Sequence, residues 1–176
     1  LETQFFAYVQ MRKLRTVRAG DLVVSVLKLA PEQERKLFSR LSRGGLIARV
    51  RPGLYLIPPG LPLGGAWTPS EALALNTLME DVKGRYQICG PNTFNQYGFD
   101  DQIPNRIYAY NNRISGDRTV GAVEMTLIKV DDARLGDTTD VVTWDGEKAI
   151  YSSRARTLVD AVYDWSRFDG IPRGYE

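Results

Sequence analysis

The feature that most restricts the fold is a pair of short β-prone segments around Pro52-Gly53, which directly follow a helical segment. Residues 46–51 and 54–57 are rich in aliphatic side chains, and Pro-Gly is favoured at the centre of a tight turn. Residues 31–43 begin with proline, carry Leu37, Phe38 and Leu41 at helical spacing, and stop at a glycine pair. A helix followed at once by a β-hairpin is therefore predicted.

The residues before this helix complete a recognisable order of elements. Residues 2–14 show helical spacing of apolar side chains, and residues 16–18 form a short β-prone segment. Residues 21–29 predict a second helix, with one face formed by Leu22, Val23, Val26 and Leu27. Helix, strand, helix, helix and hairpin is the order of a winged helix-turn-helix domain. We expect residues 1–58 to form such a domain.

A second domain of mixed α+β type is expected over residues 66–176, after a linker rich in proline and glycine. Its first helix should begin with Thr68 as N-cap, Pro69 in the first turn and Glu71 closing a capping box. Strands are expected over residues 86–89, 106–110, 123–130, 141–144 and 148–152, with a short helix over residues 91–97 and a hairpin turn at Asp145-Gly146.

Two further features of this domain are assigned to its core. A last helix over residues 153–165 should turn Leu158, Val159 and Val162 inward. Cys89 lies in an apolar strand and is expected to pack in the interior. Core packing is also the expected role of a group of aromatic residues, namely Tyr86, Phe94, Tyr97, Phe99, Tyr108 and Tyr110.

Charge is divided unevenly along the chain. Residues 1–60 carry 11 Lys and Arg against 4 Asp and Glu, a net charge of +7. Residues 61–176 carry 12 against 17, a net charge of −5. A basic first third and an acidic remainder indicate two modules with different partners.

The chain contains no histidine and a single cysteine. These counts exclude Ser-His-Asp and Cys-His catalysis, histidine-ligated zinc and four-thiolate metal sites within one chain. We therefore expect neither an enzyme nor a protein with a metal or organic cofactor. No apolar run reaches the roughly 20 residues that span a bilayer, and one cysteine forms no internal disulfide. A cytoplasmic protein without a membrane partner is expected.

The third helix and the hairpin supply the candidate binding residues. With the apolar face of the helix buried, its opposite face carries a polar stripe, and the hairpin adds two cations beside its turn. Arginine and lysine contact phosphates or guanine edges, and glutamine pairs with adenine. The predicted interface with double-stranded DNA comprises Gln33, Lys36, Arg40, Arg43, Arg49 and Arg51.

Several segments, in the right order, resemble one known family. Residues 44–55 resemble the wing of AbiEi-type antitoxins, which has a glycine, two apolar residues, basic residues and then Gly-Leu-Tyr. Four further segments also resemble this family: residues 86–91, 95–99, 102–104 and 152–161. This sequence departs from the family in two ways: many members continue beyond the position of Glu176, and this sequence starts without methionine. A fragment and a renumbered chain both stay open.

This resemblance implies an antitoxin of a bacterial two-gene system associated with phage defence. Its winged helix would repress its own promoter, and its C-terminal domain would counter a nucleotidyltransferase-like toxin. A homodimer on DNA is expected, because repressors usually read two half-sites.

Two other classes of function stay open at this point. A defence-associated, metal-dependent nuclease would use the winged helix for targeting and a set of carboxylates as ligands: Asp100, Asp101, Glu124, Asp131, Asp132 and Asp140. The nuclease pattern of an acidic residue, one residue and then lysine is absent, because Thr126 stands two places after Glu124. A winged helix that binds protein instead of DNA is the third alternative.

Overall fold

The computed structural model of the chain describes residues 1–168, which form two compact units of mixed α+β structure. The first unit comprises Leu1–Pro69 with Val120–Ala122, and the second comprises Ser70–Thr119 and the residues from Val123 on. The described part contains six α-helices and two β-sheets. Within it, no helix has the length and apolarity needed to cross a membrane.

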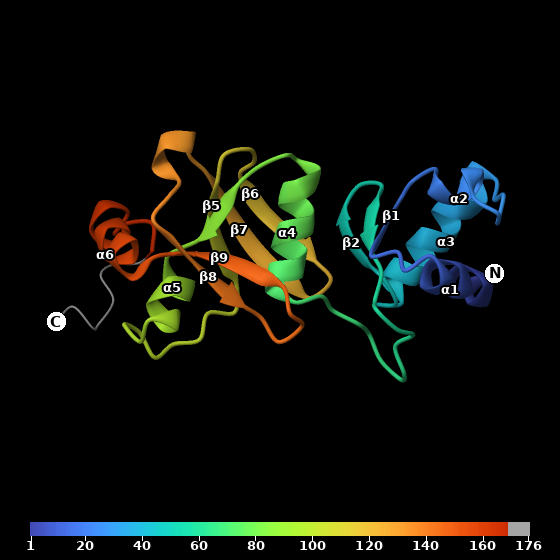
Figure 1. The fold of residues 1–176 in the computed structure, drawn as a ribbon, viewed down its shortest axis with the longest axis horizontal. Helices are drawn as coiled ribbons and strands as arrows, with labels where there is room; N and C mark the ends of the chain where they lie inside the picture. The colour runs from blue at the N-terminus through green and yellow to red at the C-terminus, as the bar shows by residue number, and fades with distance from the viewer. Residues whose placement is uncertain (169–176) are drawn as a thin grey trace. The chain divides into compact units, whose positions relative to one another are not determined.

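The elements of the first unit follow one another in the predicted order (Figure 1). They are α1 (Glu2–Met11), β1 (Thr16–Arg18), α2 (Asp21–Val24), α3 (Pro31–Arg43), β2 (Ala48–Arg51) and β3 (Leu54–Leu56). The three strands form an antiparallel sheet in the order β1-β3-β2. The hairpin between β2 and β3 turns at Pro52-Gly53, where Gly53 has a φ of 78°, a value that favours glycine.

An aromatic and aliphatic core holds the first unit together. Phe5 packs edge to face against Phe38, with ring centroids 6.1 Å apart, which joins α1 to α3. The Phe38 ring also lies 4.7 Å from that of Tyr55, which joins α3 to β3. Leu22, Leu37 and Leu41 are almost completely buried in the same cluster. The orientation of α3 against the hairpin is therefore set by packing around Phe38.

The prediction of a helix over residues 21–29 was wrong in its length, because α2 ends at Val24. The Ser25 hydroxyl donates to the carbonyl of Leu22 at 2.9 Å and accepts from the backbone N–H of Leu27 at 3.1 Å. Serine competes in this way with the helical hydrogen-bond pattern. The chain turns after α2, and Val26, expected inside, is 73% exposed.

The second unit is built on a six-stranded mixed sheet in the order β6-β7-β5-β4-β9-β8. Its strands are β4 (Tyr86–Ile88), β5 (Ile107–Asn111), β6 (Gly116–Val120), β7 (Val123–Lys129), β8 (Thr138–Val142) and β9 (Lys148–Ser152). The central pair β4 and β5 is antiparallel, whereas β5 pairs with β7 and β4 with β9 in parallel. The hairpin of β8 and β9 turns at Asp145-Gly146, as predicted.

The helices of the second unit are α4 (Glu71–Asp81), α5 (Pro91–Gln96) and α6 (Arg154–Tyr163), and a 3₁₀ turn covers Asp132–Arg134. Ser70, not Thr68, is the N-cap of α4, because its hydroxyl accepts from the backbone N–H of Leu73 at 3.1 Å. Tyr86 on β4 donates to Asn76 of α4 at 2.7 Å, so this side chain faces α4. Phe94 of α5 and Ala161 of α6 pack around Cys89 and Tyr110.

Two predictions for the second unit were incomplete or wrong. Strand β6 was not expected, because Gly116–Val120 is mostly polar and four of its five residues are exposed. Helix α6 was expected, but Val159 and Val162 point outward and are 62% and 63% exposed. Its buried positions are instead Thr157, Asp160 and Ala161.

Candidate nucleic-acid interface

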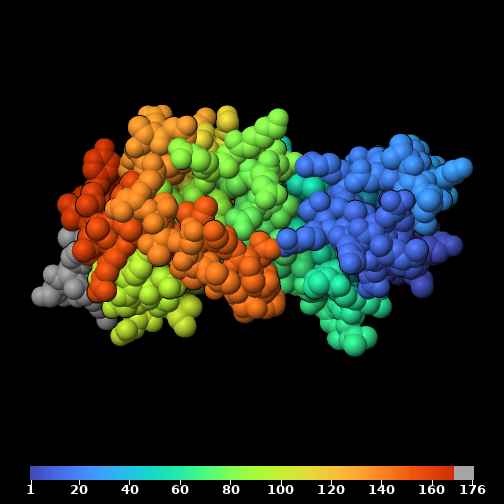
Figure 2. Space-filling view, viewed as in Figure 1, coloured from blue at the N-terminus to red at the C-terminus, as the bar shows by residue number. Residues whose placement is uncertain are grey.

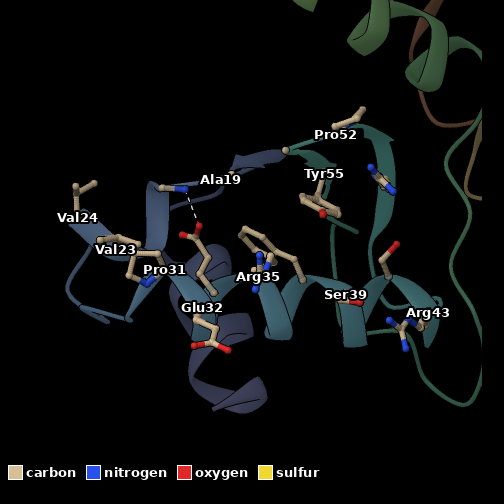
Figure 3. Close-up of a pocket in the computed structure, with 16 residues that line it drawn as sticks. Ala19, Val23, Val24, Pro31, Glu32, Arg35, Ser39, Arg43, Pro52 and Tyr55 are labelled. Carbon is tan, nitrogen blue, oxygen red and sulfur yellow. Dashed lines mark hydrogen bonds between the residues drawn. The ribbon is translucent and has the colours of Figure 1, made fainter.

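A groove of about 1080 Å³ runs between α3 and the β2–β3 hairpin within the first unit (Figure 3). One wall is α3 and the other is the hairpin, and the start of α2 closes one end. The polar and aromatic residues of its lining include Arg35, Ser39, Ser42, Arg43, Arg49 and Tyr55, together with the acidic residues Glu32 and Glu34. Figure 3 shows Arg35, Ser39 and Arg43 in succession along α3. Residues four apart share one face of a helix, which explains this row.

Three guanidinium groups of the groove have no acidic partner among residues 1–168. Arg35 and Arg43 are exposed on α3, and Arg49 is exposed on β2. Within residues 1–168 none of the three forms an ion pair. Arg49 pairs with Tyr55 across the hairpin, on the face that lines the groove, whereas the register shifts before Arg51, which pairs with Leu54 and does not line the groove. The groove therefore presents positive charge from both of its walls.

Glu34 lies among these cations in sequence, but its carboxylate is directed into the protein. The residue is buried, and its two oxygens accept hydrogen bonds from the backbone N–H groups of Gly20, at 2.6 Å, and Leu22, at 2.8 Å. Glu34 thus holds the first turn of α2 against α3. Its carboxylate is held by these backbone groups at the end of the groove next to Ala19 and Gly20.

The structure separates the predicted stripe on α3 into two faces. Arg43 lines the groove, together with Arg49 of the hairpin. Lys36 pairs with Glu32 at 3.1 Å, and Arg40 pairs with Glu2 of α1 at 2.6 Å. These two cations lie on a neighbouring face that is partly neutralised. They are not among the residues that line the groove.

The two remaining predicted residues flank this region. Gln33 accepts the backbone N–H of Ala30 at 3.1 Å through its side-chain oxygen, so it stabilises the start of α3. Arg51 is exposed at the end of β2, next to the turn of the hairpin.

Sequence reasoning missed Arg35, Ser39 and Ser42. The apolar residues Leu37, Phe38 and Leu41 identify the buried face of α3, but they do not say which side of that face adjoins the hairpin. The deciding contact is that of Phe38 with Tyr55. In the sequence, Tyr55 in the second hairpin segment was the available signal, because a large aromatic residue there must pack on the preceding helix.

The carboxylates considered for a nuclease are spread over the second unit. Asp132 accepts hydrogen bonds from Asn112 and Arg85. These bonds lower the pKa of its carboxyl, and the bond from Asn112 has the larger effect. Asp140 pairs with Lys148 at 3.2 Å, and Glu124 with Arg106 at 3.6 Å. In the described chain, no three Asp, Glu or Cys side chains come together as a metal site would require.

Among the titratable groups in the interior of the second unit are a thiol and a carboxyl whose pKa values are raised by burial. Cys89 is buried as predicted, and loss of hydration raises the pKa of its thiol well above the ordinary value. Burial also raises the pKa of Asp160, although Arg156 donates to its carboxylate at 2.9 Å. The Oδ2 atom of Asp160 is buried without a hydrogen-bond partner. A protonated buried thiol is a poor nucleophile, so Cys89 fits a packing role.

A scan of the sequence against models of protein families finds no match, and a search of curated proteins finds none.

Proposed function

We propose that the first unit is a winged helix-turn-helix domain that binds double-stranded DNA, with α3 as the reading helix and the β2–β3 hairpin as the wing. The observation that carries this proposal is the set of unpaired guanidinium groups, Arg35, Arg43 and Arg49, on facing walls of one open groove. Arginine in such a place contacts phosphate oxygens with two parallel hydrogen bonds and reads guanine in the same manner.

The electrostatics of the groove favour a polyanion over a small ligand. Glu34 is turned inward and Glu32 is paired with Lys36, so little negative charge opposes an approaching phosphate backbone. Ser39 and Ser42 add hydroxyl groups between Arg35 and Arg43, and hydroxyls also bind phosphates or base edges.

We further propose that the chain is a transcriptional repressor and the antitoxin of a phage-defence toxin–antitoxin system. This part rests on the resemblance of residues 44–55, 86–91 and 152–161 to AbiEi-type antitoxins. The DNA target is then the promoter of its own operon, and the second unit serves toxin control or contact between protomers.

The DNA-binding proposal is tested with two double variants that remove the same charge. Arg35→Gln with Arg43→Gln removes two cations of the groove, whereas Arg12→Gln with Lys13→Gln removes two exposed cations at the end of α1. Fluorescence anisotropy with a labelled duplex from the region upstream of the gene gives the affinity. The groove variant should bind at least about 30-fold more weakly, since two lost base contacts cost roughly 2–6 kcal/mol together.

The control variant should retain the affinity of the wild-type protein within about threefold, because long-range charge effects are screened by salt. An equal loss in both variants would mean that net charge alone causes binding. No binding by the wild-type protein at low salt would refute the proposal.

The antitoxin role has its own test in cells. Expression of a nucleotidyltransferase-like reading frame encoded beside this gene should arrest growth, and co-expression of the present chain should restore it. Repression is measured separately with a reporter under the upstream promoter. Loss of repression without loss of growth rescue in the Arg35→Gln, Arg43→Gln variant would assign the two activities to different units. Unrestored growth with the wild-type chain would contradict the antitoxin role.

A further inference from the structure

Large apolar side chains, of the kind that are usually buried, are exposed on the outer face of α6 and in the turn after it. Val159 and Val162 are 62% and 63% exposed, and Tyr163 and Trp165 are 71% and 60% exposed. All four lie within one short stretch of chain at the surface of the second unit. This stretch is coloured red in Figure 2. Adjacent exposed apolar residues of this kind mark interaction sites, whereas single ones need no explanation.

Arginines adjoin this face, and one of them, Arg154, places its guanidinium carbon 5.2 Å from the centroid of the Phe99 ring. Arg154 and Arg167 are exposed, and Arg134 stacks over the Tyr163 ring with its guanidinium carbon 4.9 Å from the centroid. The acidic residues of the same stretch are used internally. Asp160 is buried against Arg156, and Asp164 accepts from the Tyr110 hydroxyl and pairs with Arg134 at 3.3 Å.

A basic surface is unexpected here, because residues 61–176 carry a net charge of −5. Exposed lysine, glutamate and aspartate are absent from residues 153–168. Enrichment of tyrosine, tryptophan and arginine together with depletion of lysine and acidic residues is the composition of protein interfaces and of their energetic hot spots.

We infer that the surface defined by Val159, Val162 and Tyr163 of α6 and by Trp165 of the turn after it docks an apolar protein segment flanked by acidic residues. The apolar side chains of the segment would cover the two valines and the aromatic rings. Its carboxylates would pair with the exposed guanidinium groups of Arg154 and Arg167, because Arg134 is already paired with Asp164. This inference does not depend on the DNA-binding proposal, because it concerns a different unit and a different chemistry.

Two other occupants fit the face less well. A second copy would bring an identical surface, and a two-fold axis would oppose arginine with arginine. A lipid bilayer takes up amphipathic helices that are often 20–30 residues long and insert large apolar side chains. Helix α6 has 10 residues, and its two central apolar positions are valines.

The face is held rigidly before any partner arrives. Arg156 donates to the carbonyl of Arg134 at 2.6 Å and to Asp160 at 2.9 Å, so α6 is fastened to the loop that carries Arg134. Ser153 caps the helix by accepting from the backbone N–H of Arg156 at 3.1 Å. A preorganised surface loses little conformational entropy on binding, which favours a specific partner.

The experiment uses a random 16-residue peptide library displayed on phage and the immobilised full-length chain. Selection should enrich peptides that combine aromatic or aliphatic residues with a net negative charge. An enriched peptide is then synthesised, and its affinity is measured by anisotropy at several salt concentrations. Its affinity should fall as salt rises, because the flanking charges are exposed.

Matched variants locate the binding site. Val159→Ser with Val162→Ser should weaken the selected peptide at least about tenfold, whereas Val142→Ser with Trp144→Ser, which alters exposed apolar residues of the β8–β9 hairpin, should leave it unchanged. Arg154→Glu with Arg167→Glu should abolish binding. The control for charge is Arg118→Glu with Lys129→Glu, on exposed positions of β6 and β7, and it should retain the wild-type affinity.

Any of several results would overturn the inference. These are enrichment of peptides without net negative charge, failure to enrich any peptide, and equal weakening by the control variants. A further result is light scattering in which the wild-type chain is a dimer and the Val159→Ser, Val162→Ser variant is a monomer. This result would assign the face to a second copy of the chain. Binding to phosphatidylglycerol vesicles that is lost in the same variant would assign it to a membrane.

Discussion

At the scale of single residues, Glu34 shows how a negative charge that by its position opposes phosphate binding has a structural role instead. Near the start of α3 it would repel phosphate if it faced outward. In the structure it is buried and accepts two backbone hydrogen bonds from the first turn of α2. These bonds satisfy N–H groups that a helix start leaves without partners, and they fix α2 against α3.

Replacement of Glu34 by alanine should therefore destabilise the first unit. Two backbone donors would lose a charged acceptor, which costs about 2–4 kcal/mol in the free energy of unfolding. Urea unfolding, followed by circular dichroism, measures this loss. Glu32→Ala is the matched control, because Glu32 is an exposed partner of Lys36 and should contribute less than about 1 kcal/mol. Equal stability of the two variants would contradict the structural role of Glu34.

Asp160 predicts a dependence of stability on pH. Burial raises the folded-state pKa above the ordinary value of 3.8, so the folded protein retains a proton that the unfolded chain releases. The contribution of Asp160 to stability is then fully present below pH 3.8 and declines as pH rises through the folded-state pKa. Asp160→Asn, which has no proton to release, should flatten the fall in unfolding free energy over this range.

The pH profile is measured by urea unfolding at a series of pH values for the wild-type protein and the variant. Asp101→Asn, on an exposed loop of the second unit, serves as the control and should leave the profile unchanged. A profile for Asp160→Asn that parallels the wild type would show that Asp160 has no raised pKa.

At the scale of elements, α3 has two cationic faces with different surroundings. Arg35 and Arg43 line the groove without acidic partners, whereas Arg40 is paired with Glu2 of α1 at 2.6 Å. In the proposed complex, the carboxylate of Glu2 would compete with phosphate for Arg40. Helix α1 would then reduce the positive charge that α3 presents to the proposed duplex.

Glu2→Gln should release Arg40 and increase affinity for duplex DNA by about two- to fivefold at low salt, because an exposed ion pair contributes only up to about 1 kcal/mol. Anisotropy titration measures the change. Glu80→Gln removes one exposed carboxylate from α4 and should leave the affinity within error of the wild type. If Glu2→Gln binds no more tightly than Glu80→Gln, Arg40 does not reach the duplex.

Elements with strong local signals could be predicted from sequence, and those decided by side-chain competition or distant contacts could not. Helix α3 begins at Pro31 and ends before Gly44, as proline and glycine indicate, and the hairpin turns at Pro52-Gly53. The length of α2 depended on the hydroxyl of Ser25.

The orientation of α6 shows why apolar spacing alone was insufficient. Val159 and Val162 share a face with helical periodicity, yet the face that packs inside contains Thr157 and Asp160. The buried carboxylate of Asp160 accepts a hydrogen bond from Arg156. Arg156 is in turn held by the carbonyl of Arg134, which is distant in sequence, so the sequence pattern does not reveal this arrangement. The same reasoning applies to the groove, where Arg43 and Arg49 were predicted and Arg35 was not, because the position of the hairpin beside α3 is a tertiary property.

At the scale of the whole molecule, charge and surface chemistry divide the chain into two units with different expected partners. Residues 1–60 carry a net charge of +7 and present unpaired arginines at a groove. Residues 61–176 carry a net charge of −5 but present an apolar face with arginines around it on α6. The two proposals together describe a protein that binds a polyanion with its first unit and an acidic protein segment with its second unit.

The central claim is that the first unit binds the phosphate backbone of duplex DNA through the arginines of the groove. The most direct measurement is the affinity of the wild-type chain for a labelled duplex at increasing salt concentration. With Arg35, Arg43 and Arg49 on phosphates, log affinity should fall against log salt with a slope of about −3 or steeper. A slope near zero, or no binding at low salt, would contradict the claim.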